Sequence, residues 1–525
     1  MRTTARVFGS ILVLALAGCS SGPNETDGDI LPGDTTDAGV SDEDAGVTDD
    51  AGDETDSGDA DDIDASADAG DDVDSGDELD AGDDADAGDD GDVCGPHLTD
   101  CDGVCTHTDT DHQNCGTCGN ACQGGELCSE GECVLTCPEG REACEGGCID
   151  TKTSPDHCGG CGQVCLGECN DGSCLTVTAA ASGARHSCAL MSDKTVRCWG
   201  YNVNGELGDG SRDGRPYPGA VLSLDDVTHV ASGTSHTCAI VEDGTVRCWG
   251  NGIEGAVGDD YMGCRYEPVS VIDVEDATQL ALGADSTCAL LKDGNVKCWG
   301  YNAHGEIGDG TNTNRFIAVD VKNLSKVVQI ASQQFHTCAV REDKTVWCWG
   351  YNNMGQLGNG SSDNSSLPVQ VTGIDDAIQV AVGAMHSCAL LADETVICWG
   401  YNSSGQLGDN GSRRSTPTNP VPGLSGVKKL VAGGYFTCAL LEDETVKCWG
   451  DNDDGQLGDN TAEDNHVPQP VLALSNVVDL SAGFGHVCAV KGDGSLWCWG
   501  DNAEGQLGIG TTGWRLYPER PVRWH

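Results

Sequence analysis

Short apolar runs alternate with turn signals along the second two-thirds of the chain. Residues 238–250 read CAIVEDGTVRCWG, in which two β-like runs flank a three-residue loop that ends in Gly244. A glycine in the left-handed conformation at this point makes a type I turn with a G1 bulge. Counting back along the ladder sets Cys238 opposite Cys248, with Cα atoms about 4.5–5.5 Å apart, which a disulfide spans. The pattern predicts a β-hairpin closed by a disulfide.

The same hairpin returns every 50 residues. A Trp-Gly pair follows every second cysteine, and from the second repeat on a β-like run such as VVQIAS (327–332) precedes the first cysteine. A β-rich unit of this length that cannot bury both faces alone is typical of a propeller blade or a solenoid turn. The predicted disulfides are Cys188–Cys198, Cys238–Cys248, Cys288–Cys298, Cys338–Cys348, Cys388–Cys398, Cys438–Cys448 and Cys488–Cys498.

The N-terminus carries the marks of export. Two arginines precede the apolar run VFGSILVLALAG, which is too short for a permanent membrane helix. The run ends in LAGC (16–19), which resembles the bacterial lipobox and implies a signal peptide over residues 1–18 and lipidation of Cys19; a plain secretory signal is the alternative. Ser20 favours sorting to the outer membrane. We expect a bacterial cell-envelope protein held at the membrane by its lipid and exposed at the cell surface.

Charge separates the next segment from the rest. Residues 22–93 hold 30 of the 86 Asp and Glu residues and no Lys or Arg, in a chain of 525 residues with a formal charge of −59. Such a segment can bury too little to offset the entropy of ordering its backbone, so residues 19–93 are predicted to form a disordered acidic linker. Calcium binding is the alternative, but Gly88 stands where a loop that begins at Asp84 needs its third oxygen ligand. The acidity predicts no nucleic-acid partner.

Residues 94–174 hold sixteen cysteines in two copies of one spacing pattern. Units of about 40 residues cannot build adequate cores, so disulfides must hold them, and eight cysteines in each unit leave 105 pairings open. The segments NCGTCGNAC and HCGGCGQVC resemble the cysteine-rich repeats of the stigma-specific protein family, which implies small disulfide modules. Zinc is the alternative because Cys115-x2-Cys118 and Cys158-x2-Cys161 have ligand-like spacing. Export favours oxidation over zinc binding here, and over reduced cysteines in the 50-residue repeats.

The stretch HTCAIVEDGTVRCWG (236–250), followed by an N-x-x-G-x-x-G phrase, resembles the repeat of the regulator of chromosome condensation family. Members of that family form seven-bladed β-propellers, and the resemblance covers residues 176–525. It implies an all-β chain in which a seven-bladed propeller (175–525) follows the disulfide-rich modules and the acidic linker. The eukaryotic relative promotes nucleotide exchange on a small GTPase and binds chromatin, and neither role is expected of an exported, strongly acidic chain. Other propellers of this repeat type bind proteins through one face.

Ring closure is expected to involve the C-terminal tail. Repeat 1 lacks the proline-flanked strand that precedes the other repeats, such as PVQV at 368–371. The missing piece is found at the far end, in YPERPV (517–522). We expect this tail to pair into the first blade as a clasp.

Five repeats carry a histidine two positions before the first cysteine. A ring of imidazoles suggests a metal site, but one histidine per blade favours a repeated role in packing and hydrogen bonding. The seven repeated tryptophans are predicted to pack between blades. We find no nucleophile–base pair, carboxylate pair or phosphate loop, so no catalytic residue, metal site or cofactor is predicted. The histidines are His186, His236, His336, His386 and His486.

One cysteine is left over in this scheme. With Cys19 lipidated, sixteen cysteines belong to the modules and fourteen to the blade pairs. The remaining residue, Cys264 in YMGCRYEP, is a candidate free thiol or a cross-link to another chain.

The segments that follow each Gly-x-x-Gly phrase differ most between repeats, as a recognition surface does. They are residues 211–219, 261–267, 311–317, 361–367, 411–419 and 461–467. We expect a non-catalytic cell-surface protein that binds a protein or another surface ligand through these loops. The alternatives are a structural envelope protein without a specific partner, and an enzyme with an acidic or histidine cluster in the propeller channel.

Overall fold

The computed structural model describes residues 98–101, 104–165 and 168–524. The predicted signal peptide (1–18), the lipidated Cys19 and the acidic linker (19–93) lie outside these residues. Over the described ranges, no helix combines the length and the hydropathy that a membrane crossing demands. Regular structure in this part of the chain is β, apart from the single 3-10 turn η2 (Pro155–His157).

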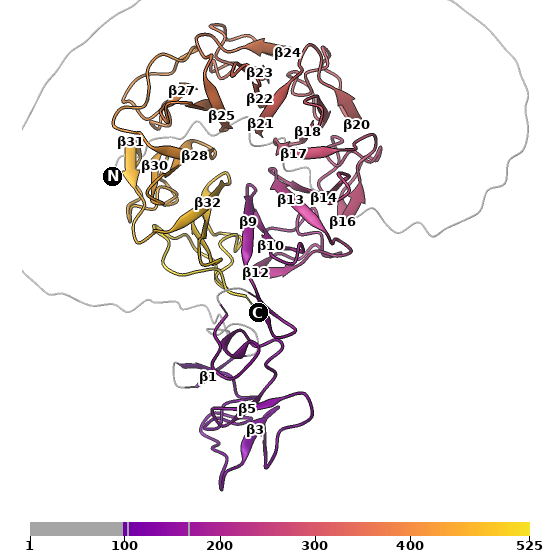
Figure 1. Cartoon of the computed structure of the whole chain (residues 1–525), viewed down its shortest axis with the longest axis vertical. Helices are drawn as coiled ribbons and strands as arrows, with labels where there is room; N and C mark the ends of the chain where they lie inside the picture. Colours follow the sequence, from indigo (N-terminus) through magenta and orange to yellow (C-terminus); the bar gives the residue numbers. More distant parts are fainter. Residues whose placement is uncertain (1–97, 102–103, 166–167, 525) are drawn as a thin grey trace, which may run out of the picture. The chain divides into compact units, whose positions relative to one another are not determined.

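Each 50-residue repeat folds into one antiparallel sheet whose strands follow one another in sequence order. Figure 1 shows these sheets around a common centre, with the first strand of each sheet nearest to it. The first three strands come from the apolar runs that the sequence pattern predicts. Five sheets have a fourth strand, which comes from the segment that follows and contains proline in four of them. Proline is tolerated there because the strand is a sheet edge.

The strand bounds are as follows. The first three sheets contain β9 (Val177–Ser182), β10 (His186–Met191), β11 (Val196–Gly200) and β12 (Arg215–Ala220); β13 (Val227–Ser232), β14 (His236–Val241), β15 (Val246–Gly250) and β16 (Arg265–Ser270); and β17 (Ala277–Leu282), β18 (Ser286–Leu291), β19 (Val296–Gly300) and β20 (Arg315–Asp320). The next two contain β21 (Val327–Gln333), β22 (His336–Arg341), β23 (Val346–Gly350) and β24 (Ser365–Gln370); and β25 (Ala377–Val382), β26 (His386–Leu391) and β27 (Val396–Gly400). The last two contain β28 (Val427–Ala432), β29 (Phe436–Leu441), β30 (Val446–Gly450) and β31 (Asn465–Pro470); and β32 (Val477–Ala482), β33 (His486–Lys491) and β34 (Leu496–Gly500).

The hairpin of residues 238–250 has the predicted register. Cys238 of β14 lies opposite Cys248 of β15, and Gly244 adopts the left-handed conformation with φ +80°. A disulfide joins the two cysteines in each of the seven repeats, with Cα atoms 4.0–4.2 Å apart. Four repeats place a larger residue in the left-handed position, at a cost of about 1 kcal/mol each. They are Lys194, Lys344, Glu394 and Glu444, with φ between 64° and 67°.

Neighbouring sheets share their cores. One cluster contains thirteen buried residues, from Cys338 in the fourth repeat to Trp399 in the fifth. The Trp399 side chain is fully buried, and its Nε1 atom donates a hydrogen bond to the backbone oxygen of Gln356 at 2.8 Å. The predicted position of the tryptophans between sheets is therefore confirmed. The equivalent bonds of Trp199, Trp249, Trp299, Trp349, Trp449 and Trp499 measure 2.8–3.0 Å.

The C-terminal tail belongs to the last sheet, and the predicted pairing with the first sheet is wrong. Bridges join Trp497 to Pro521 and Gly500 to Arg515, so the tail takes the fourth-strand position beside β34. The fourth strand of the first sheet is β12, from its own repeat. The proline-flanked segment therefore ends a repeat and does not begin one. The tail still reaches the first repeat through its side chains, because the Trp524 ring contacts Trp199 edge-on with centroids 6.3 Å apart.

The cysteine-rich region consists of short strands held by disulfides. Its strands are β1 (Thr99–Cys101), β2 (Val104–Thr106), β3 (Leu127–Ser129), β4 (Glu132–Val134), β5 (Glu142–Cys144), β6 (Gly147–Ile149), β7 (Glu168–Asn170) and β8 (Ser173–Leu175). The two units share a sheet, since β3 pairs in parallel with β6. The described bonds follow one order in both units, with the second cysteine bonded to the fifth, the fourth to the seventh and the sixth to the eighth. They are Cys101–Cys118, Cys115–Cys128 and Cys122–Cys133 in the first unit and Cys144–Cys161, Cys158–Cys169 and Cys165–Cys174 in the second. In the second unit, Cys137–Cys148 also joins the first cysteine to the third.

Candidate functional site

The repeated histidines join neighbouring sheets. The Nε2 atom of His336 lies 2.9 Å from Ser387 Oγ, and this hydroxyl donates to the backbone oxygen of Gln356 at 3.0 Å. Because the hydroxyl has one proton, the histidine must donate from Nε2. Burial lowers the pKa of His336 to about 3, so the ring is neutral at pH 7. The other four, His186, His236, His386 and His486, contact hydroxyls of the next repeat at 2.8–2.9 Å, which is the predicted packing role.

One of the segments expected to form the recognition surface, residues 311–317, is held in place by several contacts with the scaffold. Of residues 311–317, the last three belong to β20. Asn302 is fully buried and its Nδ2 atom donates to the backbone oxygen of Thr313 at 3.0 Å. The Asp309 carboxylate accepts a hydrogen bond from Arg315 Nη2 at 2.5 Å. The polar groups of this segment are therefore used to fix the loop, while segment 261–267 exposes the large side chains of Tyr261 and Met262. The binding role of the six segments stays a prediction.

The first strands of the sheets enclose a cavity of about 240 Å³. Gln329 lines it, but its amide binds the next sheet: Nε2 donates to Val380 O at 3.0 Å and Oε1 accepts from Val380 N at 2.8 Å. Gln279 and Gln379 make the same pair of bonds to the strand that follows each of them. These amides therefore clamp adjacent sheets. We call this place in the repeat the clamp position. Its residues in the seven repeats are Ala179, His229, Gln279, Gln329, Gln379, Lys429 and Asp479.

Ionisable side chains take the clamp position in three repeats. Lys429 forms an ion pair with Asp479. Burial lowers the pKa of His229, and the charge of Lys429 lowers it further. None of the serine hydroxyls described in the channel is hydrogen-bonded to His229, so these residues do not form a nucleophile–base pair. The described channel therefore contains a cluster of His229, Lys429 and Asp479, in which the lysine and the aspartate form an ion pair.

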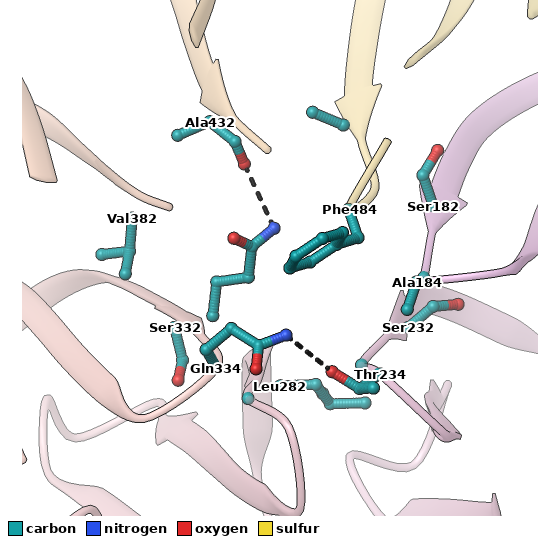
Figure 2. Close-up of a pocket in the computed structure, with 15 residues that line it drawn as sticks. Ser182, Ala184, Ser232, Thr234, Leu282, Ser332, Gln334, Val382, Ala432 and Phe484 are labelled. Carbon is teal, nitrogen blue, oxygen red and sulfur yellow. Dashed lines mark hydrogen bonds between the residues drawn. The ribbon is translucent and has the colours of Figure 1, made fainter. Parts of the chain in front are cut away.

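One end of the channel is filled by large side chains (Figure 2). Repeat 4 reads SQQFH, where the other six repeats have glycine at the position of Gln333. The Nε2 atom of Gln334 donates to Thr234 Oγ1 at 3.2 Å, and that of Gln333 donates to the backbone oxygen of Ala432 at 3.5 Å. Phe484 points into the same space and leaves a cavity of about 80 Å³. Side chains from the second, fourth, sixth and seventh repeats thus meet at this end.

Two groups of aromatic rings, one around Phe335 and one around Tyr435, lie near the filled end, and we call the two groups together the aromatic arc. Its rings belong to the third to seventh repeats and all are half-buried. Phe335 follows Gln334 in the chain and contacts Tyr301 and Tyr351, with centroids 6.1 and 6.3 Å apart. Tyr435 contacts Phe484 at 5.9 Å. The complete arc is Tyr301, His304, Phe335, Tyr351, Tyr401, Tyr435 and Phe484.

Carboxylates with raised pKa values lie next to both ends of the arc. Burial, together with the nearby Glu254, raises the pKa of Asp285 to about 6. Burial also raises the pKa of Asp451 to about 7, with a further contribution from Asp464 and two other aspartates. Asp285 and Asp451 are backbone neighbours of the arc, because Tyr301 N donates to Asp285 O at 2.8 Å and Asp451 N donates to Tyr435 O at 3.0 Å. The arc thus combines aromatic faces with negative charge.

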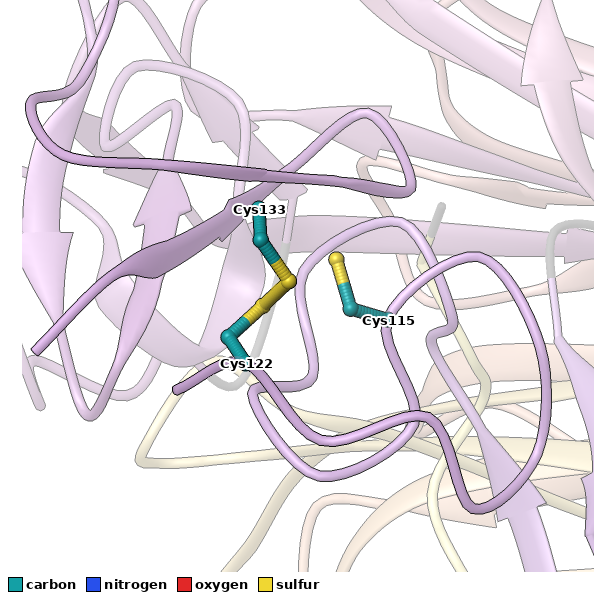
Figure 3. Close-up of side chains that lie close together, drawn as sticks. All are labelled: Cys115, Cys122 and Cys133. Atoms are coloured by element: carbon teal, nitrogen blue, oxygen red, sulfur yellow. A yellow bond between two sulfur atoms is a disulfide. The ribbon is translucent and has the colours of Figure 1, made fainter. Parts of the chain in front are cut away.

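Three sulfur atoms in the first cysteine-rich unit approach one another as metal ligands do (Figure 3). Cys122 is bonded to Cys133, and the neighbouring Cys115 is bonded to Cys128. Zinc binds thiolates, which a disulfide does not provide. The arrangement therefore agrees with the oxidised alternative for this unit.

Cys264 is disulfide-bonded, and no described cysteine is a free thiol. The prediction of a free thiol at this position is therefore wrong. It depended on an odd count of 31, which arises when Cys19 is set aside from an even total of 32.

The chain belongs to the RCC1-like domain family, whose model matches residues 140–487. Models of the RCC1 repeat also match residues 477–506 and 493–523, which confirms the resemblance to regulator of chromosome condensation repeats. Among solved structures, yeast RCC1 (Prp20), crystallised with Kap60, is 22% identical with a TM-score of 0.56, over 66% of this chain and 87% of that one. Human WBSCR16 is 24% identical with a TM-score of 0.55, over 60% of this chain and 86% of that one. These likenesses show the fold alone. No curated protein matches the sequence.

Sequence reasoning missed both the clamp position and the aromatic arc. Alignment of the repeats at intervals of 50 would have found the first, since the column reads Ala, His, Gln, Gln, Gln, Lys, Asp. The same alignment places Tyr301, Tyr351 and Tyr401 in one column, directly after Trp-Gly. It does not show that Phe335, Tyr435 and Phe484 lie beside them, because these come from other positions of the repeat.

Proposed function

We propose that this chain is a lipid-anchored bacterial cell-surface protein whose repeats form a closed seven-bladed propeller that binds a protein partner without catalysis. The observation that carries the binding function is the aromatic arc. Half-buried tyrosine and phenylalanine side chains gathered on one part of a scaffold are the residues that dominate protein interfaces. Membership of the RCC1-like domain family supports a role in protein interaction.

The contacts between the last and first repeats support closure of the ring. His486 Nε2 lies 2.8 Å from Ser187 Oγ, the bond that joins successive repeats elsewhere. Trp199 Nε1 donates to the backbone oxygen of Gln506 at 2.8 Å, which continues the tryptophan series in the same way. A closed ring would present the arc on a rigid surface, and this favours binding because little conformational entropy is lost.

Photo-cross-linking on intact cells tests the binding function. A benzophenone amino acid is placed at Tyr351 in the arc, or at the exposed Asp363 on an outer segment as the matched control. We expect a discrete protein adduct from position 351 and far less from position 363. Equal labelling at both positions, or none at 351, would contradict the proposal.

The anchor is tested separately. Cys19→Ala should release the protein from the membrane fraction into the medium, because a lipidated cysteine is the proposed attachment. Retention of this variant in the membrane fraction would refute lipidation at Cys19.

A further inference from the structure

We infer that the aromatic arc binds arginine or lysine side chains of its protein partner. The inference rests on the proposed protein-binding function and names the chemistry of the bound groups. An ammonium or guanidinium group over the face of an aromatic ring is attracted by the ring quadrupole, most strongly where water is partly excluded. The half-buried rings of the arc meet this condition.

The molecule contains an example of this contact at the same repeat position. In repeat 1, the guanidinium of Arg185 lies over the ring of Tyr201, 5.9 Å from its centroid. A carboxylate accompanies the pair, since Arg185 Nη1 lies 3.8 Å from Glu504 Oε1. Tyr201 follows Trp-Gly, as do Tyr301, Tyr351 and Tyr401 of the arc. Repeat 1 thus shows how a cation fits against a tyrosine in this column.

The arc lacks the cation that repeat 1 supplies for itself. The residues equivalent to Arg185 in repeats 3, 4 and 5 are Asp285, Phe335 and Met385. Over the described ranges, the cation–ring contacts involve other rings, and none involves any of the four tyrosines of the arc. A partner's arginine or lysine would supply the cation that these repeats do not provide for their own tyrosines.

Charge complementarity favours the same occupant. Glu254 and Asp285 lie near one end of the arc, and Asp451 lies near the other. The one titratable base in the arc does not oppose a cation, because burial lowers the pKa of His304 and leaves the ring neutral at pH 7. A bound cation would also stabilise the ionised form of these carboxylates, whose pKa values are raised by burial. Both the rings and the charges therefore select a positive group.

Binding of a decapeptide of alternating arginine and glycine to the full-length chain tests the inference. Affinity is measured by calorimetry in 0.15 M salt for the wild type, Tyr351→Ala/Tyr401→Ala and Tyr351→Phe. We expect the double variant to bind about tenfold more weakly, since two cation–ring contacts are lost. Tyr351→Phe should bind within about twofold of the wild type, because the ring face remains.

Tyr201→Ala is the matched control, since its ring is already covered by Arg185, and its affinity should stay within about twofold. The acidic linker is the same in every variant. If the peptide binds only through diffuse attraction to this linker, all variants will have equal affinities, and that result would overturn the inference. Equal binding of a citrulline–glycine peptide would overturn it as well, and so would binding of cellohexaose in place of the arginine peptide. If the benzophenone at position 351 captures a protein while the arginine peptide fails to bind, the protein-binding function stands and this inference falls.

Discussion

Disulfides cross-link both described regions of the chain, but they are packed in different surroundings. In the cysteine-rich region, the buried apolar clusters consist of disulfide-bonded cysteines. They are Cys115, Cys122 and Cys128 in one unit, and Cys158, Cys165 and Cys169 in the other. In the repeats, a disulfide is one part of a larger core, such as the thirteen buried residues that the fourth and fifth repeats share.

This difference assigns two roles to the same bond. Units of about 40 residues bury too little surface to fold without cross-links, so their disulfides take the place of a core. A repeat already has a specified turn, a register and a buried tryptophan, so its disulfide reinforces a structure that packing stabilises. The repeats should instead be sensitive to their buried polar groups, since each is desolvated and depends on few partners.

Lowering the pH should give the largest difference in stability between the two regions, because the five buried histidines belong to the repeats. Their folded pKa values of about 3, or about 4 for His486, lie below the unfolded value of 6.5. Their stability contribution is therefore present above pH 6.5 and is lost as the pH falls, by about 1.4 kcal/mol per histidine per pH unit. Chemical denaturation, monitored by tryptophan fluorescence, should show that the free energy of unfolding of the repeats falls steeply between pH 6.5 and 4.5.

A matched variant isolates this effect. Repeats 6 and 7 replace the histidine and hydroxyl by the buried pair Phe436 and Val487. His336→Phe/Ser387→Val copies that pair and should remove about one fifth of the slope between pH 6.5 and 4.5. An unchanged slope would show that the buried histidines do not govern acid sensitivity.

Removal of a disulfide from a cysteine-rich unit should have the next largest effect. Cys158→Ala/Cys169→Ala removes two of the three residues in one buried cluster. We expect a loss of about 2–5 kcal/mol, which is enough to unfold so small a unit. Limited proteolysis with mass spectrometry should detect new cleavage within residues 137–174, while tryptophan fluorescence reports unchanged repeats. Continued protection of residues 137–174 would contradict the role assigned to sulfur.

The same change in a repeat should be milder. Cys438→Ala/Cys448→Ala should lower the free energy of unfolding by about 2–3 kcal/mol and keep the β circular dichroism. The loss should be smaller for Cys238→Ala/Cys248→Ala, because Gly244 fits that turn without strain while Glu444 does not. Urea denaturation measures both variants. Equal losses would show that the disulfide does not compensate for turn strain.

A stabilising substitution should show the smallest effect. Burial raises the pKa of Glu306 to about 8, above its unfolded value of 4.5, so its stability contribution is full below pH 4.5 and is lost as the pH rises to 8. The equivalent residue is glutamine in four repeats, including Gln356. Glu306→Gln should add about 2 kcal/mol at pH 6 and almost nothing at pH 4.5, as measured by urea denaturation at both pH values. A gain of equal size at both pH values would rule out the ionisation of Glu306 as the cause.

Much of the scaffold follows from local sequence. The Asp-Gly turn and the ten-residue spacing of Cys238 and Cys248 act on neighbouring strands, so register and sulfur pairing are decided within one hairpin. The position of the tryptophans follows from their size and their single recurrence in each repeat. The sequence of the tail at 517–522 predicts pairing with a sheet edge, but the edge that it joins depends on how the repeats pack.

The candidate site depends on contacts between repeats, which no local pattern encodes. Phe335 and Phe484 are 149 positions apart, yet both belong to the arc, and Gln334 reaches Thr234 across the channel. The sequence by itself determined the hairpins, their spacing and their cysteine pairs, because turn chemistry and strand periodicity act over about ten residues. The tertiary structure decided which side chains of different repeats meet, because that depends on how the sheets pack around their centre.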